Sequence, residues 1–189
     1  MSIRKRSVAH PALVWAVSFM MGLLLILLSG SPARAGESNV DFTGQLVEDP
    51  CTVAAGPDGD AVEVAFGTIP DNMLYLHKRT WTETFHITLQ DCDLTLGTKV
   101  HLTFTGSEDS EQPGLLAVTG AATHVAVGLL TADGRAIPLN KQTNDFILSK
   151  GNTTLQFGAY VQASVTGIKA HTIGRGDFTA ITTFEIEYL

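Results

Sequence analysis

Histidines and carboxylates are the first side chains to consider for catalysis or metal binding. No two histidines stand at the His-x-x-x-His spacing that places two metal ligands on one helix face. The acidic run at 108–111 lacks the alternating ligands and the glycine of a calcium loop. Asp91 and Asp93 resemble a pair of catalytic acids, but on a strand they flank a cysteine and share one face. We therefore expect no catalytic residue, no metal and no cofactor. The histidines, expected at solvated strand positions, are His77, His86, His101, His124 and His171.

The first 35 residues have the layout of a secretory signal peptide. A basic stretch at 4–6 precedes an apolar run at 12–28, and Ala-Arg-Ala at 33–35 forms a cleavage site. We expect cleavage before Gly36 and no stable membrane insertion afterwards. The apolar run also approaches the length that spans a bilayer. N-terminal sequencing of the exported protein distinguishes a cleaved signal from an uncleaved anchor.

Two cysteines, Cys51 and Cys92, are the only ones in the chain. An even pair in an exported protein predicts one disulfide. This disulfide would close a loop of about 40 residues. In the chain-entropy description, the restriction it places on the unfolded chain raises the free energy of unfolding by roughly 4 kcal/mol.

The net charge of the chain argues against partners that carry many phosphate groups. The chain has 12 basic and 19 acidic residues, a net charge of −7, and four of the basic residues fall in the signal peptide. The exported part is therefore more acidic still. Because such a surface repels phosphate groups, nucleic acid and anionic lipid are poor partners.

Strand-like alternation dominates the rest of the chain. All threonines lie after residue 42, among many Val, Ile and Phe residues, which favour strands. Apolar side chains recur at every second position, with Gly, Pro and Asp-Gly turns between the runs. The sequence therefore predicts an all-β protein, a β-sandwich. The alternating apolar sets are Val40, Phe42 and Leu46; Phe85, Ile87 and Leu89; Val100, Leu102 and Phe104; Val125, Val127 and Leu129; Leu155, Phe157, Ala159 and Val161; and Phe184, Ile186 and Tyr188.

The last expected strand, 178–188, has no following segment to pair with its outer edge. A bare apolar edge promotes aggregation. An exported protein with such an edge needs a partner to cover it.

Four motifs together carry a family resemblance. From end to end, the part after the signal peptide resembles the pilin subunits of chaperone-usher fimbriae, the type 1 and P pilus family. Gly176 and the penultimate Tyr188 match the C-terminal signature of that family. The motifs are Val40-Asp-Phe-Thr-Gly-Gln-Leu46 with Pro50-Cys51; Phe85 to Cys92; Leu102 to Gly106 with Gly114 to Gly120; and Gly176 to Phe178 with Phe184 to Leu189.

The resemblance implies an incomplete immunoglobulin-like sandwich that lacks its final strand, with a donor-strand extension at 36–50 and a pilin domain at 51–189. In such pilins a periplasmic chaperone lends a strand to a groove, and the extension of the next subunit replaces it at the outer-membrane usher. Here Val40, Phe42 and Leu46 would enter a neighbour's groove, and Gly44 would let two backbones approach closely. The acceptor groove would involve Gly176, Phe184, Ile186, Tyr188 and Leu189. The implied destination is the fimbria, reached through the periplasm, with neighbouring pilins as partners.

Two alternatives concern the kind of subunit. Only 36–39 precede Val40 in the expected extension, which resembles minor or adaptor pilins more than a rod subunit. A secreted glycan-binding or protein-binding module of the same fold is the second functional class. Tyr75 and Trp81 are the aromatic residues that could stack on a sugar, and we expect Trp81 to pack in the core.

Overall fold

The computed structural model describes residues 46, 48–54 and 61–189. The expected signal peptide and the extension residues Val40, Phe42 and Gly44 lie outside these residues.

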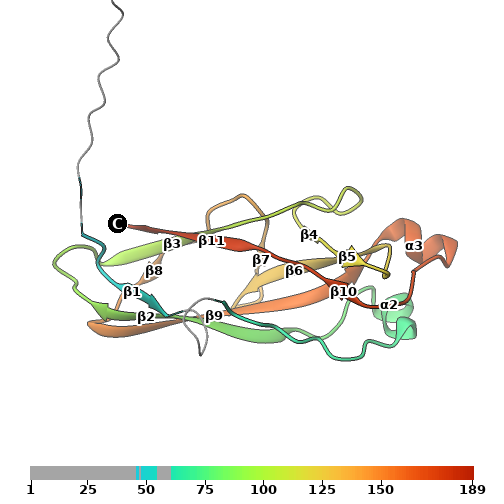
Figure 1. The fold of residues 1–189 in the computed structure, drawn as a ribbon, viewed down its shortest axis with the longest axis horizontal. Coiled ribbons are helices and arrows are strands. Elements are labelled where there is room, and N and C mark those ends of the chain that lie inside the picture. Colours follow the sequence, from blue (N-terminus) through green and yellow to red (C-terminus); the bar gives the residue numbers. More distant parts are fainter. Residues whose placement is uncertain (1–45, 47, 55–60) are drawn as a thin grey trace, which may run out of the picture. The chain divides into compact units, whose positions relative to one another are not determined.

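Two antiparallel sheets form the body of the described part (Figure 1). The larger sheet has the order β1-β2-β9-β6-β4, with β7 also paired to β6, and the smaller has the order β11-β3-β8. A separate short ladder joins β5 and β10. The strands are β1 (Thr52–Ala54), β2 (Glu83–Cys92), β3 (Lys99–Thr105), β4 (Leu116–Ala117), β5 (Thr119–Gly120), β6 (Val125–Thr131), β7 (Ala136–Ile137), β8 (Phe146–Ile147), β9 (Gly151–Ala163), β10 (Phe178–Thr179) and β11 (Thr183–Tyr188).

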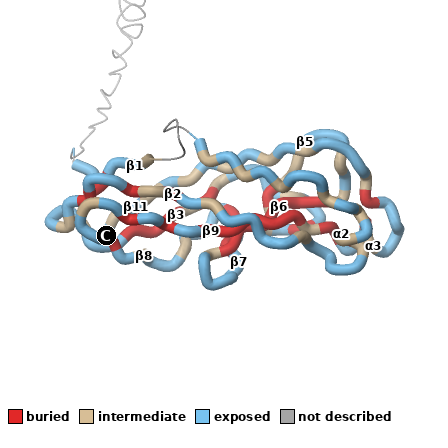
Figure 2. The backbone as a smooth tube through the Cα atoms, turned by 90° about the horizontal axis from the view of Figure 1, so that it is seen from below, coloured by how far each residue is buried: buried red, intermediate tan, exposed pale blue. Residues whose placement is uncertain are grey.

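The core lies between the two sheets, and Figure 2 shows buried residues concentrated along β6 and β9. Phe104 of β3 meets Phe157 of β9 edge to face, with ring centroids 5.3 Å apart, a geometry that aromatic pairs favour. The predicted alternation is confirmed in β2, β11 and the first half of β9. In β6 both faces are buried, and in β3 His101 is buried instead of solvated as expected. These two packed sheets confirm the expected all-β sandwich.

A disulfide joins Cys51 and Cys92, as predicted. It ties the residue before β1 to the last residue of β2, and the Asp93 amide donates to the Pro50 carbonyl 2.8 Å away. The short strand β1 is thereby fixed to the larger sheet beyond its own three-residue ladder.

Two short helices were not predicted. They are α2 (Asp71–His77) and α3 (Val165–Ala170). The Ser164 hydroxyl caps α3 by accepting a hydrogen bond from the Gly167 amide, and α2 ends at Lys78 in the left-handed conformation. Helices of this length show too little periodicity to stand out in a sequence.

The prediction of one continuous strand over 178–188 was wrong. β10 pairs with β5, whereas β11 pairs with β3. At the break, the Thr182 hydroxyl donates to the Thr105 carbonyl at 2.8 Å. A Cβ on Gly106 would lie 3.3 Å from the Ile181 carbonyl oxygen, so the chain passes close to Gly106 as it moves from one partner strand to the other.

Candidate functional site

The strand β11 is an edge strand whose apolar side chains are incompletely covered. In the described part of the chain it pairs with β3 alone. Its alternation places one side-chain set inward and half-buried and the other outward and exposed. The inward set is Phe184, Ile186 and Tyr188.

An open groove separates β11 from the edge strand of the other sheet, β1. Its volume is about 570 Å³. Phe184, Ile186 and Tyr188 form one wall, so these three predicted groove residues are brought together. The opposite wall consists of Glu48, Asp49, Cys51, Thr52 and Val53.

The segment 61–69 is another unpaired run, and the sequence reasoning missed it. Val62, Val64 and Phe66 are half-buried against the core and alternate with exposed neighbours. No backbone hydrogen bond joins 61–69 to another described residue. Phe66 lies next to Phe178 of β10, with ring centroids 6.2 Å apart. The alternation of Val62, Val64 and Phe66 was the available sequence signal, and it matches a strand that has no partner among the described residues.

Tyr188 bridges the two walls of the groove. Its hydroxyl donates to the Cys51 carbonyl 3.4 Å away. Burial, and then the negative charge of Asp49, raise the pKa of Tyr188 above its ordinary value. The strand pairing continues past Tyr188, because the Leu189 amide donates to the Lys99 carbonyl at 2.9 Å.

The remaining predicted site residues are placed differently. Gly176 lies in the turn before β10 with φ 139°, and a Cβ there would stand 2.5 Å from the Ala121 Cβ, so its position requires a glycine. Leu189 is half-exposed beyond the end of β11. Leu46 is 101% exposed and contacts no part of the groove.

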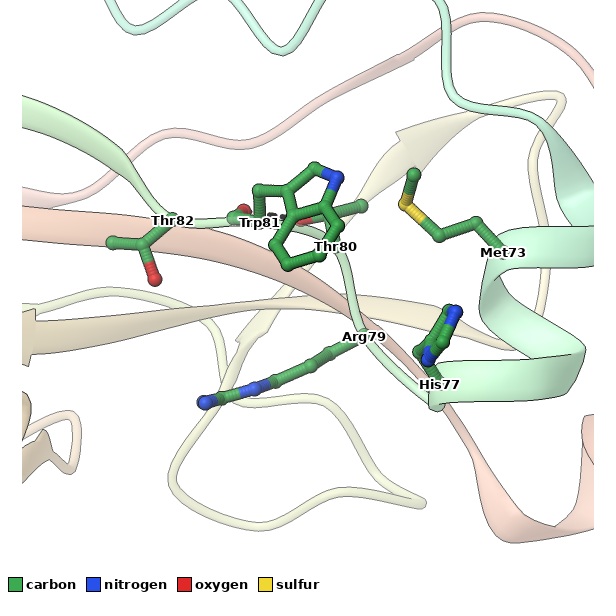
Figure 3. Close-up of a pocket in the computed structure, with 6 residues that line it drawn as sticks. All are labelled: Met73, His77, Arg79, Thr80, Trp81 and Thr82. Atoms are coloured by element: carbon green, nitrogen blue, oxygen red, sulfur yellow. Dashed lines mark hydrogen bonds between the residues drawn. The ribbon is translucent and has the colours of Figure 1, made fainter.

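A shallow second hollow lies beside α2 and the start of β2 (Figure 3). The expectation that Trp81 packs in the core was wrong, because its side chain is 74% exposed. The hollow measures about 190 Å³, and the indole lies 6.4 Å from the His77 ring. In Figure 3 the Met73 side chain points toward the indole, whereas Arg79 points away from it. The Arg79 guanidinium instead lies over the Tyr160 ring at 4.9 Å.

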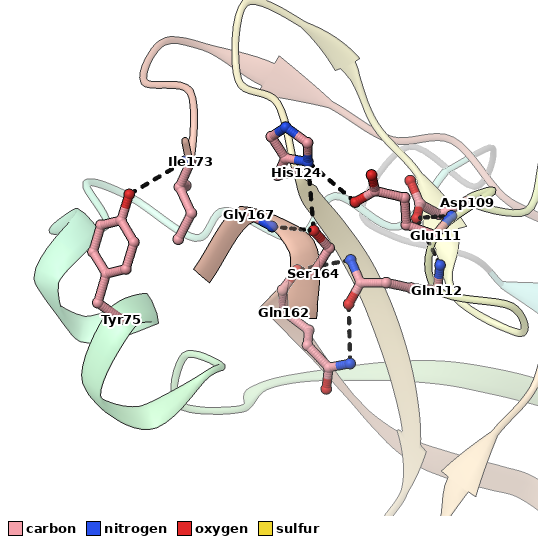
Figure 4. Close-up of polar contacts among 9 residues, drawn as sticks. All are labelled: Tyr75, Asp109, Glu111, Gln112, His124, Gln162, Ser164, Gly167 and Ile173. Atoms are coloured by element: carbon pink, nitrogen blue, oxygen red, sulfur yellow. Dashed lines mark hydrogen bonds and ion pairs between the residues drawn. The ribbon is translucent and has the colours of Figure 1, made fainter. Parts of the chain in front are cut away.

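A serine, a histidine and a glutamate meet at the start of α3 (Figure 4). Glu111 and the Ser164 hydroxyl both contact Nδ1 of His124, at 3.1 and 3.5 Å. Hydrogen bonds from Ser164 and His124 lower the pKa of Glu111. A nucleophile and an orienting carboxylate must use opposite ring nitrogens, and Ser164 is a buried helix cap. The arrangement fixes a loop rather than activating a hydroxyl.

Within 46, 48–54 and 61–189, no three His, Cys, Asp or Glu side chains are grouped to hold a metal ion. The same part of the chain contains no helix long and apolar enough to cross a bilayer.

Comparison with known proteins gives a consistent result. Residues 40–189 match the family described as fimbrial protein. The major MR/P fimbria protein of Proteus mirabilis (strain HI4320) is 34% identical, covering 91% of this chain and 97% of that protein. The fimbrial adapter PapK of Escherichia coli is 35% identical, covering 88% and 97%.

Two solved structures show the same fold. The P pilus rod subunit PapA superposes with a TM-score of 0.64 at 21% identity, covering 75% of this chain and 100% of that chain. A solved structure of a chaperone-usher pilus gives a TM-score of 0.63 at 23% identity, covering 82% of this chain and 97% of that chain. Together with the paired cysteines and the alternating strands, the matched residues confirm the resemblance. The chain belongs to the fimbrial protein family, as a structural subunit of the cell-surface fimbria and not an enzyme.

Proposed function

We propose that this subunit polymerises by donor-strand exchange, with the groove beside β11 as acceptor and the extension 36–50 as donor. The observation that carries the proposal is the half-buried stripe of Phe184, Ile186 and Tyr188 on a strand whose outer edge is unpaired within the described part of the chain. An added strand could pair with that edge and cover the stripe. Val40, Phe42 and Leu46 alternate with the spacing that such a strand needs.

The partners that follow from this proposal are a periplasmic chaperone, an outer-membrane usher and neighbouring pilins. An uncovered edge strand is prone to aggregate, so a chaperone strand would fill the groove before assembly. Without it, the isolated exported chain should aggregate or insert its own extension. A stable, cooperatively unfolding monomer with an empty groove would contradict the proposal. Co-purification from the periplasm followed by mass spectrometry identifies the chaperone.

Substitution in the extension separates folding from assembly. Gly44→Arg should leave chaperone-assisted folding intact and block fibre growth, because the side chain would collide with the acceptor backbone. Gln45→Arg adds the same charge on the opposite face of the extension and serves as the matched control. Fibre length by electron microscopy is the measurement. Normal fibres from Gly44→Arg would remove the role assigned to that glycine.

We also infer a minor or adaptor position in the fibre. The support is the short stretch 36–39 before the donor residues. The relatives include both an adapter and a major fimbria protein, at 35% and 34% identity, so sequence identity does not separate the two positions. Quantitative mass spectrometry of purified fimbriae tests the inference, which predicts few copies of this subunit per fibre. A copy number matching that of the main rod protein would overturn it.

A second candidate function is glycan binding at the hollow beside Trp81. An exposed indole face is a suitable platform for a sugar ring, and the hollow, about 190 Å³, is smaller than the roughly 300 Å³ at which pockets accept drug-sized ligands. A glycan array probed with a groove-filled monomer tests this function, with Trp81→Ala as the control. Binding that disappears in Trp81→Ala supports it, and fibre incorporation without glycan binding opposes it.

A further inference from the structure

The groove is bordered by acidic side chains. Glu48 and Asp49 line one wall. On the opposite wall, Glu185 and Glu187 are the outward, exposed residues of β11. The sequence has no Lys or Arg within 46–69 or 176–189.

Little of this negative charge is compensated inside the chain. Glu187 contacts His101 Nε2 at 2.9 Å and accepts a hydrogen bond from Gln142 at 3.3 Å. Glu48, Asp49 and Glu185 form no ion pair with any described residue. An incoming strand would therefore meet these carboxylates with their charges uncompensated.

The extension of this same chain is also acidic. Between 36 and 46 the only charged side chains are Glu37 and Asp41. Asp41 lies between Val40 and Phe42, so it faces outward when those two side chains insert. Outward residues of an added strand stand beside the outward residues of β11, whichever way the strand runs. Asp41 would then lie on the face that carries Glu185 and Glu187, and like charges across a ladder are destabilising.

We propose that the groove of this subunit takes a strand from a different protein, one that carries Lys or Arg at its outward positions, rather than the extension of a second copy of this chain. The inference rests on the proposed donor-strand function and adds partner choice to it. The apolar anchors supply most of the affinity, and the outward charges select among strands that share those anchors. A subunit with such a groove joins unlike neighbours.

Peptide exchange tests the proposal. Three peptides spanning 36–46 are offered to the chain purified from the periplasm with whatever protein fills its groove: the native sequence, a neutral form with Glu37→Gln and Asp41→Asn, and a basic form with Glu37→Lys and Asp41→Lys. Native mass spectrometry measures incorporation. At low salt the basic peptide should be taken up about fivefold to tenfold more than the native one, with the neutral form between them. At high salt the three should converge, because exposed charges are screened.

Variants of the groove edge complete the test. Glu185→Lys should reverse or abolish the preference, and Glu185→Gln should reduce it. Glu83→Lys changes an exposed acidic residue on the first position of β2 and should leave the preference unchanged. Equal uptake of native and basic peptides at low salt overturns this inference while leaving the groove intact. If no peptide enters a folded chain, the donor-strand proposal itself fails, and the partner inference fails with it.

Discussion

The strands β3 and β11 carry the same pattern in the same sheet and differ in how it is covered. Their apolar residues are direct cross-strand partners: Phe104 faces Phe184, Leu102 faces Ile186 and Val100 faces Tyr188. The β3 members are 0–1% exposed, whereas all three on β11 are only half-buried. β3 lies between two strands, and β11 lies at the edge. Alternation therefore specifies which face is apolar, and topology decides whether that face is covered.

The largest expected difference between the two strands comes from truncating the facing phenylalanines. Phe104→Ala should destabilise the domain by about 3–5 kcal/mol, as for a fully buried aromatic residue. Phe184→Ala should cost about half as much while the groove is empty, because less of its surface is removed from water. Unfolding rates, measured by stopped flow on chain freshly separated from its groove partner and before it aggregates, compare the two variants. Filling the groove should bring the cost at Phe184 closer to that at Phe104, and equal costs with an empty groove would contradict the comparison.

The disulfide supports the groove wall opposite β11, because it ties β1 to β2. Replacing Cys51 and Cys92 together by serine should lower the free energy of unfolding by about 2–4 kcal/mol. The loss of stability should be largest in β1, because this strand is held to the sheet by a ladder of only three residues. Hydrogen exchange tests this: amides near β1 should lose protection while those of β9 keep it. Equal loss in both strands would show that the bond supports the whole sandwich rather than the groove wall.

A smaller effect is expected at the bridge made by Tyr188. Its raised pKa means that the folded state favours the neutral phenol. The associated stability is present below the ordinary pKa of 10.0 and is lost as the pH rises through the folded-state pKa. Tyr188→Phe should remove this alkaline loss and lower stability near neutral pH by about 1 kcal/mol or less. Phenolate absorbance during a pH titration follows the group directly, and unchanged alkaline stability in the wild type would contradict this assignment.

The smallest effect concerns an ion pair outside both strands. The Arg175 guanidinium donates two hydrogen bonds to Asp71, at 3.0 and 2.6 Å, linking α2 to the turn before β10. These hydrogen bonds lower the pKa of Asp71 below its ordinary 3.8. The contribution is present above that pH and is lost as the pH falls through the folded-state pKa. In Arg175→Gln the loss of stability at acid pH should be slightly smaller than in the wild type. The change is small because exposed ion pairs contribute little to stability. Thermal denaturation across acid pH measures the change, and a large loss at neutral pH would contradict a surface role.

The difference between β3 and β11 also shows which parts of the fold could be predicted from the sequence. The strands β2, β11 and the first half of β9 were recognisable because their side chains alternate between a packed and an exposed face, whereas β6 is buried on both faces. The break between β10 and β11 was not, since the whole run 178–188 is strand-forming and only the close approach at Gly106 explains the crossing. Trp81 was misplaced because whether an indole is covered depends on distant segments.

The candidate site was predictable only in part, because a local pattern shows which side chains are apolar but not which of them are covered. Phe184, Ile186 and Tyr188 were proposed from a family resemblance, and the structure places them on one groove wall. The run Val62, Val64 and Phe66 was overlooked, although its alternation is as regular. Nothing in a local pattern distinguishes a strand that has a partner from one that lacks it. That distinction appears only when the hydrogen bonds of the folded chain are followed.

The ladder between β11 and β3 also has a mechanical consequence. It runs in register from Thr183 to Tyr188, along the strand beside which a donor segment would lie. A donor paired along the same length would be joined to β11 by a ladder of its own, and tension along the donor would load those hydrogen bonds in shear, so that they resist together rather than opening one after another. We therefore expect a fibre built from this subunit to yield between subunits only at forces that rupture a whole ladder at once.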